Sequence, residues 1–274
     1  MAKIGVAATA PFGADVLERL ARADDVAFLL TRPDRPRGRG RRVGAPPAKE
    51  VAERLGIEVR QPERLDESVE VGDLDAMVVV AYGALIPESL LGRTLWLNVH
   101  PSLLPRWRGA APVERALMAG DTETGVTIHR TTAQLDAGPI AAQRAFAIQP
   151  EDDAGAVYAR AGELAAELLE GVLAGEPSFE PQPDEGATYA ERLTAEDRDL
   201  DWSRPPQDLL NRIRALSPHV GARGEVDGRT LTVWRARPAS HESALTVDGI
   251  ELLEVQPEGR TRMSGAEYLR GLRT

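Results

Sequence analysis

The sequence predicts an α/β protein with a doubly wound, largely parallel sheet, followed by a smaller β-rich domain. Up to about residue 173, short apolar runs alternate with segments of helical periodicity, as expected of βαβ units. Two of these runs, Asp75–Ala81 and Leu95–Val99, are apolar almost throughout, which is typical of parallel strands buried on both faces. Towards the carboxyl end, short strand-like runs are separated by Asp-Gly and glycine turn signals.

The first part of the chain divides into expected strands and helices. The helix from about Ala154 to Leu173 is the clearest, because Val157, Ala161 and Leu168 recur at the spacing of one helical face. Two further helices are expected at Ala14–Ala23 and Pro47–Leu55. The expected strands are Lys3–Ala8, Val26–Thr31, Glu58–Arg60, Asp75–Ala81, Leu95–Val99, Gly125–Arg130 and Ile140–Ile148.

A stretch rich in proline and acid separates the two expected domains. Gly175–Ala190 has no hydrophobic periodicity and is expected to be a linker or an extended crossing segment. After it we expect a short helix with Ser203 as N-cap and Pro205 in its first turn. The expected boundaries are therefore a first domain at 1–176, a linker at 177–202 and a second domain at 203–274.

Composition and missing motifs restrict the possible functions. The chain has 274 residues, a formal net charge of −10 and no cysteine, which excludes disulfides and thiolate metal sites. No apolar run approaches the roughly 18 residues of a transmembrane helix, so we expect a soluble, cytoplasmic protein without a membrane partner. The loop after the first expected strand reads ATAPFG, and GxGxxG, GxxxxGKS, HExxH and GxSxG motifs are absent. Nicotinamide and nucleoside-triphosphate chemistry are disfavoured, and no histidine has a partner at metal-ligand spacing.

Asn98 and His100 form the main candidate site. They lie two positions apart at the end of an expected parallel strand, so both side chains point to one face, at the sheet edge where ligands bind. A histidine there can act as a general acid or base, and an asparagine amide can donate to an oxyanion. Asp136, in the tight turn QLDAGPI, is the best candidate to orient the imidazole. On chemistry alone, purely structural roles for these residues stay open.

Positive charge is concentrated in one segment. Thr31–Arg42, TRPDRPRGRGRR, contains a single acid, Asp34. Its glycines and prolines make a poor helix and suit a flexible loop that binds phosphates, although charge runs are usually solvated surface. The candidate nucleic-acid contacts are Arg35, Arg37, Arg39, Arg41 and Arg42.

Several motifs carry a family resemblance. NVHPSLLPRWRGAAP, followed by ALMAGDTETGVTI and QLDAGPI, resembles the formyltransferases that use 10-formyltetrahydrofolate. Within that family, the chain is similar to the members that formylate methionine on initiator tRNA. This narrower resemblance rests on RWRGAAP, PDRPRGRGRR, VVVAYGALIP, TYAERLTAEDRDLDW and the ending LLEVQPEGRTRMSGAEYLRG, which occur in the same order.

The resemblance implies a fold, a donor and an acceptor. The fold would be a Rossmann-like formyl-transfer domain followed by an OB-like β-barrel that helps hold tRNA. The formyl donor would be 10-formyltetrahydrofolate, without a metal, and the acceptor initiator Met-tRNA, whose acceptor end the arginine-rich loop enters. The family usually acts as a monomer.

The resemblance also implies site residues. Asn98 and a protonated His100 would stabilise a tetrahedral oxyanion, while Asp136 would hold His100 and help relay the proton. The expected folate contacts are Val80, Tyr82, Gly83, Leu85, Ser102, Leu103, Leu104, Pro105 and Leu135.

The sequence departs from the family pattern in places, and other functions stay open. The segment between Trp234 and Leu245 is short, so we expect a trimmed barrel. The catalytic trio alone does not separate transfer to tRNA from transfer to an amino-sugar nucleotide or to glycinamide ribonucleotide. A noncatalytic RNA-binding protein on the same scaffold is a further alternative. His129, His219 and His241 are interpreted as structural or surface residues.

Overall fold

A computed structural model of the chain describes residues 1–37, 42–239 and 244–272. Its contacts divide the chain into two compact units, which we call the first and the second unit. The first unit contains Met1–Ala110, Gly125–Phe146 and Tyr158–Tyr189; the second contains Ala111–Thr124, Ala147–Val157 and Ala190–Thr274. This division differs from the expected boundaries, because two internal segments pack with the C-terminal residues.

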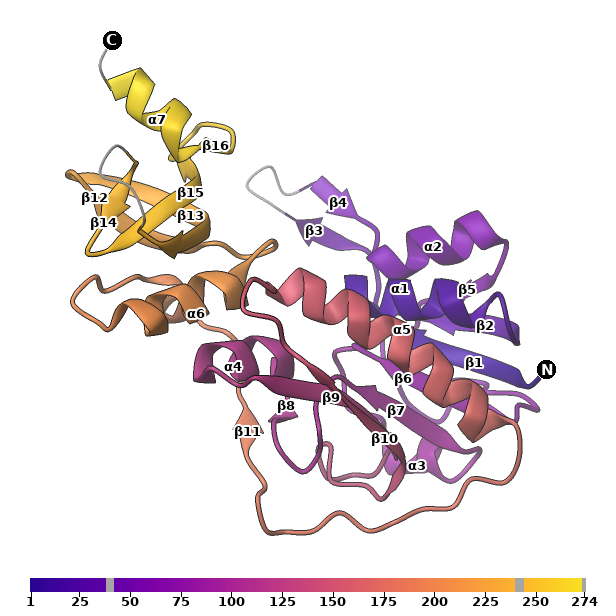
Figure 1. The fold of residues 1–274 in the computed structure, drawn as a ribbon. Coiled ribbons are helices and arrows are strands. Elements are labelled where there is room, and N and C mark those ends of the chain that lie inside the picture. The colour runs from indigo at the N-terminus through magenta and orange to yellow at the C-terminus, as the bar shows by residue number, and fades with distance from the viewer. Residues whose placement is uncertain (38–41, 240–243, 273–274) are drawn as a thin grey trace. The chain divides into compact units, whose positions relative to one another are not determined.

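A seven-stranded sheet forms the centre of the first unit (Figure 1). Four of its strand pairs are parallel, whereas β9 runs antiparallel to β7. Neighbouring strands lie on both sides of β1, so the sheet is doubly wound, with a switch point between β1 and β6. In sheet order the strands are β10 (Ile140–Ala147), β9 (Glu123–Arg130), β7 (Trp96–His100), β6 (Ala76–Val80), β1 (Lys3–Ala8), β2 (Asp25–Leu30) and β5 (Glu58–Arg60).

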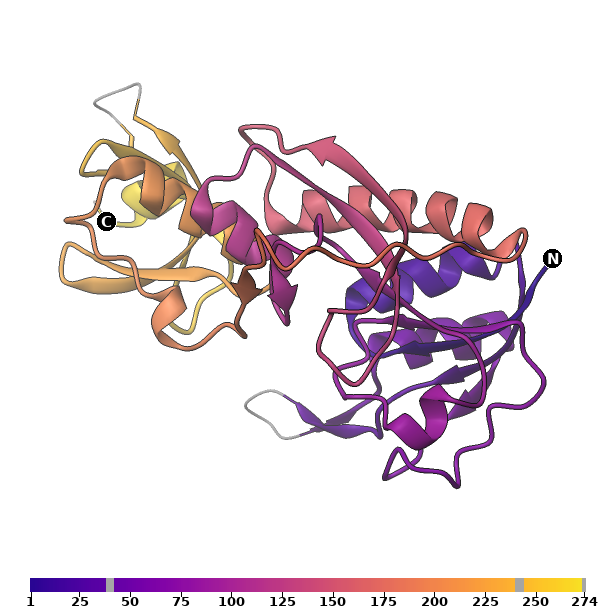
Figure 2. The ribbon, with the colours of Figure 1, turned by 90° about the horizontal axis from the view of Figure 1, so that it is seen from below.

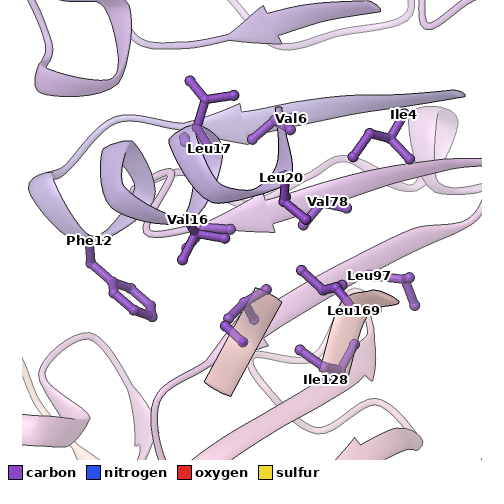
Figure 3. Packing of buried hydrophobic residues seen from close by; sticks show 14 of the residues in the cluster. Ile4, Val6, Phe12, Val16, Leu17, Leu20, Val78, Leu97, Ile128 and Leu169 are labelled. Atoms are coloured by element: carbon purple, nitrogen blue, oxygen red, sulfur yellow. The ribbon is translucent and has the colours of Figure 1, made fainter. Parts of the chain in front are cut away.

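Alternate residues of the strands point to opposite faces of this sheet. Val6, Val78, Leu97 and Ile128 pack against helices α1 (Pro11–Leu20), α2 (Pro47–Leu55) and α5 (Ala154–Leu173) in one buried cluster, part of which is drawn in Figure 3. Met77, Val79 and Trp96 belong to a second cluster with Leu90 of the short helix α3 (Glu88–Leu91). Every residue of β6 is buried, as its apolar run predicts.

Most expected elements of the first unit are present, with shifted ends. α2, α5, β1 and β5 have the expected bounds. α1 begins at Pro11 rather than at Ala14, because proline at the first helical turn already has a helical φ and lacks an N–H that would go unpaired. The sheet is largely parallel, as expected, and β9 runs antiparallel beside β7.

The arginine-rich segment is a strand pair rather than an open loop. β3 (Arg35–Arg37) and β4 (Arg42–Gly44) pair antiparallel, and Arg37 lies directly opposite Arg42. Figures 1 and 2 show the two strands extending away from the central sheet of the first unit. Arg39 and Arg41, two of the expected nucleic-acid contacts, lie outside the described residues.

The second unit is a small antiparallel β domain with helices. β12 (Ala222–Val226), β13 (Arg229–Pro238), β15 (Ile250–Pro257) and β14 (Thr246–Val247) pair in this order, and β16 (Met263–Ser264) pairs with β15. Within the described residues these pairs do not close a barrel, because β12 and β14 lie at the two ends of the order. The helical elements are α4 (Pro112–Ala119), η1 (Glu196–Arg198), α6 (Pro206–Leu216) and α7 (Gly265–Leu272).

Helix α6 explains why the units differ from the expected domains. It packs against α4, whose Arg115 also forms a paired hydrogen bond with Asp197 at 2.7 and 2.9 Å. The expected N-cap is wrong: α6 has Pro205 at that position, and the Ser203 hydroxyl donates instead to Asp201 Oδ1 at 2.7 Å. Among the described helices, none has the length and hydropathy needed to cross a membrane.

Candidate active site

Asn98, His100 and Asp136 meet in one cluster of the first unit. Asn98 and His100 occupy alternate positions at the carboxyl end of β7, on the face to which Trp96 points. Asp136 reaches them from the segment between β9 and β10, where its φ is 48°. Asn98 Nδ2 donates to Asp136 Oδ1 at 3.1 Å, and Asp136 Oδ2 lies 3.7 Å from His100 Nδ1. The sequence-predicted trio is therefore assembled in space, while its catalytic roles stay a prediction.

His100 is buried as a neutral imidazole. Its Nε2 lies 2.8 Å from the carbonyl oxygen of Trp107, and because a carbonyl only accepts, Nε2 carries the proton. Burial lowers the pKa of His100 and outweighs the raising effects of Asp136 and of the Trp107 carbonyl. Near neutral pH, Nδ1 is therefore unprotonated and faces the carboxylate.

Asp136 is ionised although it is almost fully buried. Burial alone would raise the pKa of Asp136, but its neighbours, among them the Gly109 N–H, hold that pKa below its usual value. The Gly109 N–H donates to Asp136 Oδ2 at 2.8 Å, while Oδ1 accepts from Asn98. Each carboxylate oxygen thus has a donor from a different segment, which fixes the plane of the carboxylate.

His129 is a member of this cluster that the sequence interpretation missed. It is 2% exposed and lies directly opposite Asn98 in the antiparallel β7–β9 pair. Its Nε2 lies 3.0 Å from Asn98 Nδ2 and 3.7 Å from Asp136 Oδ1. One signal was available: Val126 and Ile128 alternate with polar Thr127 and His129, which predicts a polar face on this strand. Which strand lies beside it could not be read from the sequence.

Gln182 is a second residue that sequence reasoning missed, because it lies in the expected linker. Its Nε2 donates to the carbonyl oxygens of Asp136 and Gly138 at 2.9 and 2.7 Å. Its Oε1 accepts from Arg108 Nε and Nη2 at 3.1 and 2.8 Å. A single side chain therefore ties the Asp136 turn to the loop that follows β7.

The loop after β7 is fixed by the same returning segment. Trp107, whose carbonyl binds His100, has a φ of 64°, a conformation uncommon for residues other than glycine. Its N–H donates to Thr188 Oγ1 at 2.9 Å. β8 (Arg108–Gly109) then pairs with β11 (Tyr189–Ala190). The stretch expected to be a linker thus supports the site directly.

The expected folate contacts differ in accessibility. Gly83, Leu85 and Leu135 are exposed, and the two leucine side chains are 69% and 54% exposed. Leu103 and Pro105 are half-buried. Val80, Tyr82, Ser102 and Leu104 are buried, and the Ser102 hydroxyl donates to the Arg106 carbonyl at 2.7 Å. Because this last group is buried, the side chains open to a ligand are those of Leu85, Leu103, Pro105 and Leu135.

The base of the arginine-rich strand pair is neutralised. Lys49 Nζ donates to Asp34 Oδ2 at 2.8 Å, and Gln61 Nε2 donates to Asp34 Oδ1 at 2.7 Å. Lys49 is thus paired with the single acid of the segment. In the described part of the chain, no group of His, Asp and Glu side chains has the arrangement of a metal site.

Comparisons with known proteins show the family to which the chain is related. The chain matches the formyl transferase family model over residues 3–173 and the formyl transferase C-terminal domain model over residues 192–249. It is 41% identical over 300 residues to the methionyl-tRNA formyltransferase of Halorhodospira halophila, covering 99% of this chain and 97% of that protein. It is 39% identical over 284 residues to the methionyl-tRNA formyltransferase of Paracoccus denitrificans, covering 96% and 95%.

Solved structures share the fold at lower identity. The methionyl-tRNA formyltransferase from Clostridium thermocellum has a TM-score of 0.62 at 14% identity, covering 97% of this chain and 100% of that chain. An N-formyltransferase from Helicobacter canadensis, solved with folinic acid and dTDP-3-aminofucose, has a TM-score of 0.67 at 17% identity, covering 92% and 98%. At these identities the likeness concerns the fold alone.

Proposed function

The chain belongs to the methionyl-tRNA formyltransferase family, and we propose that the Asn98–His100–Asp136 cluster transfers the formyl group of 10-formyltetrahydrofolate to the α-amine of methionine on initiator tRNA. One observation carries the proposal. A neutral buried imidazole faces an ionised carboxylate at the carboxyl end of β7, beside an asparagine amide. This combination provides a base, a counter-charge for the protonated base and an oxyanion donor.

His100 acts as the base in this scheme. When the amine nitrogen bonds to the formyl carbon, it becomes positively charged and must lose a proton. His100 Nδ1 accepts that proton, and the imidazolium is stabilised by the Asp136 carboxylate 3.7 Å away. The proton then passes to N10 of the folate as the bond between the formyl carbon and N10 breaks. His100 is therefore protonated during the reaction and not beforehand, which differs from the expectation of an initially protonated histidine.

Asn98 supplies a donor for the tetrahedral oxyanion. Before reaction, both N–H groups of its amide have protein acceptors, Asp136 Oδ1 and His129 Nε2. The oxyanion is charged and accepts more strongly than a neutral imidazole nitrogen. We expect the N–H directed at His129 to be shared with the oxyanion as it forms, while the bond to the Asp136 carboxylate persists.

Two exposed side chains suit the folate. Leu85 and Leu135 present apolar surface in the two segments that the family resemblance places against the cosubstrate. The switch point between β1 and β6 adjoins the loop that carries Leu85, in the position where doubly wound sheets bind ligands.

The arginine-rich strand pair is proposed to bind the tRNA. The segment Thr31–Arg42, which contains both strands, concentrates arginines and has a single acid, Asp34. Arginine side chains contact the phosphates of nucleic acids and supply much of the binding affinity. The described candidates are Arg35, Arg37 and Arg42, and Arg39 and Arg41 complete the predicted set. We also propose that the protein acts as a cytoplasmic monomer, and its lack of cysteine suits a reducing compartment.

An acceptor assay tests this proposal. Purified full-length protein is given 10-formyltetrahydrofolate with initiator Met-tRNA, an amino-sugar nucleotide or glycinamide ribonucleotide. We expect formylation of Met-tRNA, its loss in His100→Ala, and an unchanged rate in His219→Ala, which alters an exposed histidine of the second unit. Formylation of the sugar or the ribonucleotide instead of Met-tRNA would refute the acceptor. Full activity of a folded His100→Ala variant would refute the site.

A further inference from the structure

His129 lies where it can control the amide of Asn98. The two residues are directly opposite in the β7–β9 pair, so their side chains project from the same face of the sheet. His129 is 2% exposed, and its ring lies 6.4 Å from the His100 ring, centroid to centroid, in an edge-on arrangement. The charged or titratable groups that face it are Asp136 and His100.

The hydrogen bonds of His129 define its tautomer. Its Nδ1 lies 3.0 Å from the backbone carbonyl oxygen of Arg130, which only accepts, so Nδ1 carries the proton. In the neutral ring, Nε2 then has a lone pair. Asn98 Nδ2, 3.0 Å away, has only hydrogens to offer, so Nε2 accepts from the amide.

The amide of Asn98 is consequently held at two points. The Asp136 carboxylate fixes which end of the amide is nitrogen, because an amide oxygen in that place would face a negative charge. The bond to His129 fixes the rotation of the amide about the bond to Asp136. Without an acceptor at Nε2, the half-buried amide keeps a single protein partner and turns about it.

We propose that His129 is a positioning residue: its unprotonated Nε2 holds one N–H of Asn98 in the orientation from which the amide reaches the oxyanion. This inference rests on the proposed role of Asn98 in formyl transfer. His129 touches neither the donor nor the acceptor in this proposal and acts only through the amide. Asn98 in turn caps Nε2, so the negative charge of Asp136 stays available to His100.

Two substitutions at His129 separate an acceptor from a space-filling role. His129→Gln places Oε1 near the position of Nε2 and keeps an acceptor, whereas His129→Met fills similar volume without an effective one. We expect kcat to fall about tenfold in His129→Met, as for the loss of one hydrogen bond, with KM for both substrates within twofold. His129→Gln is expected to restore kcat to within about threefold of the wild type. The matched control is His219→Gln, which is expected to leave kcat unchanged.

A double-mutant cycle tests whether His129 acts through Asn98. In the Asn98→Ala background, His129→Met is expected to cost nothing further, because the amide that it positions is already absent. A full tenfold cost in that background would overturn the proposal. So would wild-type kcat in His129→Met, or failure of a folded His129→Gln variant to recover activity.

An NMR measurement tests the contact without turnover. The two side-chain amide protons of Asn98 are expected to resonate separately and exchange slowly in the wild type and in His129→Gln. In His129→Met, one of them is expected to shift and exchange faster. No difference between the Gln and Met variants would overturn the inference even if formyl transfer is confirmed. Conversely, the predicted shift in a protein that does not formylate Met-tRNA would place the failure in the proposed function.

Discussion

Asp136→Asn is the substitution whose effect the structure defines most sharply. The change preserves the size of the side chain and removes its charge. In the wild type, one carboxylate oxygen accepts a hydrogen bond from Gly109 N and the other accepts one from Asn98 Nδ2. In the variant, one of these two oxygens is replaced by an NH₂ group. That group faces a donor, so one hydrogen bond is lost and two donors are brought together.

The larger loss is electrostatic. At 3.7 Å, the attraction between the protonated His100 and the Asp136 carboxylate is about 4–5 kcal/mol for an effective dielectric constant of about 20. At about 1.4 kcal/mol for each factor of ten, this corresponds to a rate loss of roughly 10³. Part of the charge is also screened by neighbouring dipoles. We therefore expect kcat to fall by about 10²–10³-fold, with a smaller change in KM for the folate.

The pH dependence gives an independent check. Asp136 raises the pKa of His100 against the lowering effect of burial, so its removal lowers that pKa further. The acid limb of kcat/KM, where His100 becomes protonated and no longer acts as a base, should then move to lower pH. The measurements are steady-state formylation of Met-tRNA between pH 5 and 8 and thermal unfolding of each variant.

A matched control is Asp184→Asn, which removes an exposed carboxylate from the same unit. It is expected to keep the wild-type rate to within twofold. A folded Asp136→Asn variant with kcat within tenfold of the wild type would refute the assigned role of the carboxylate. An acid limb that moves to higher pH would refute the electrostatic argument.

Three further outcomes follow from the same contacts. Replacing Arg35, Arg37 and Arg42 with alanine should weaken tRNA binding and reduce the slope of log affinity against log salt by roughly two to three. An unchanged slope would contradict phosphate binding. Gln182→Ala removes the donor to the Asp136 and Gly138 carbonyls. The free energy of unfolding should therefore fall by about 2–3 kcal/mol, and kcat should fall more than KM rises. Unaltered unfolding and kcat would contradict the supporting role of Gln182. Because the folded-state pKa of His100 lies below its ordinary 6.5, the unfolded chain binds the proton first, and stability should decline as pH falls below about 6.5 towards that lower pKa. His100→Gln should flatten that decline in urea unfolding between pH 7 and 5, and an equal decline in both proteins would contradict it.

The sequence alone determined the main architecture and half of the site. Buried runs such as Asp75–Ala81 predicted parallel strands, and the spacing of Asn98 and His100 placed both side chains on one face, because local periodicity fixes the direction of side chains within a strand. The turn motif QLDAGPI made Asp136 the best candidate carboxylate, and the family resemblance added its role. Each of these inferences uses only the order of residues within one short segment, and that order can be read from the sequence without knowing the fold.

The tertiary structure decided what surrounds those residues. His129 became a partner of Asn98 only through the antiparallel register of β7 and β9, and Gln182 reached the Asp136 turn from a segment without any periodic signal. The arginine-rich stretch contains a strand pair because β3 and β4 pair with each other. The composition of the segment does not predict this pairing. The same is true of His100: its neutral state follows from burial, which outweighs the raising effects of Asp136 and of the Trp107 carbonyl on its pKa, and only the folded chain brings these groups together.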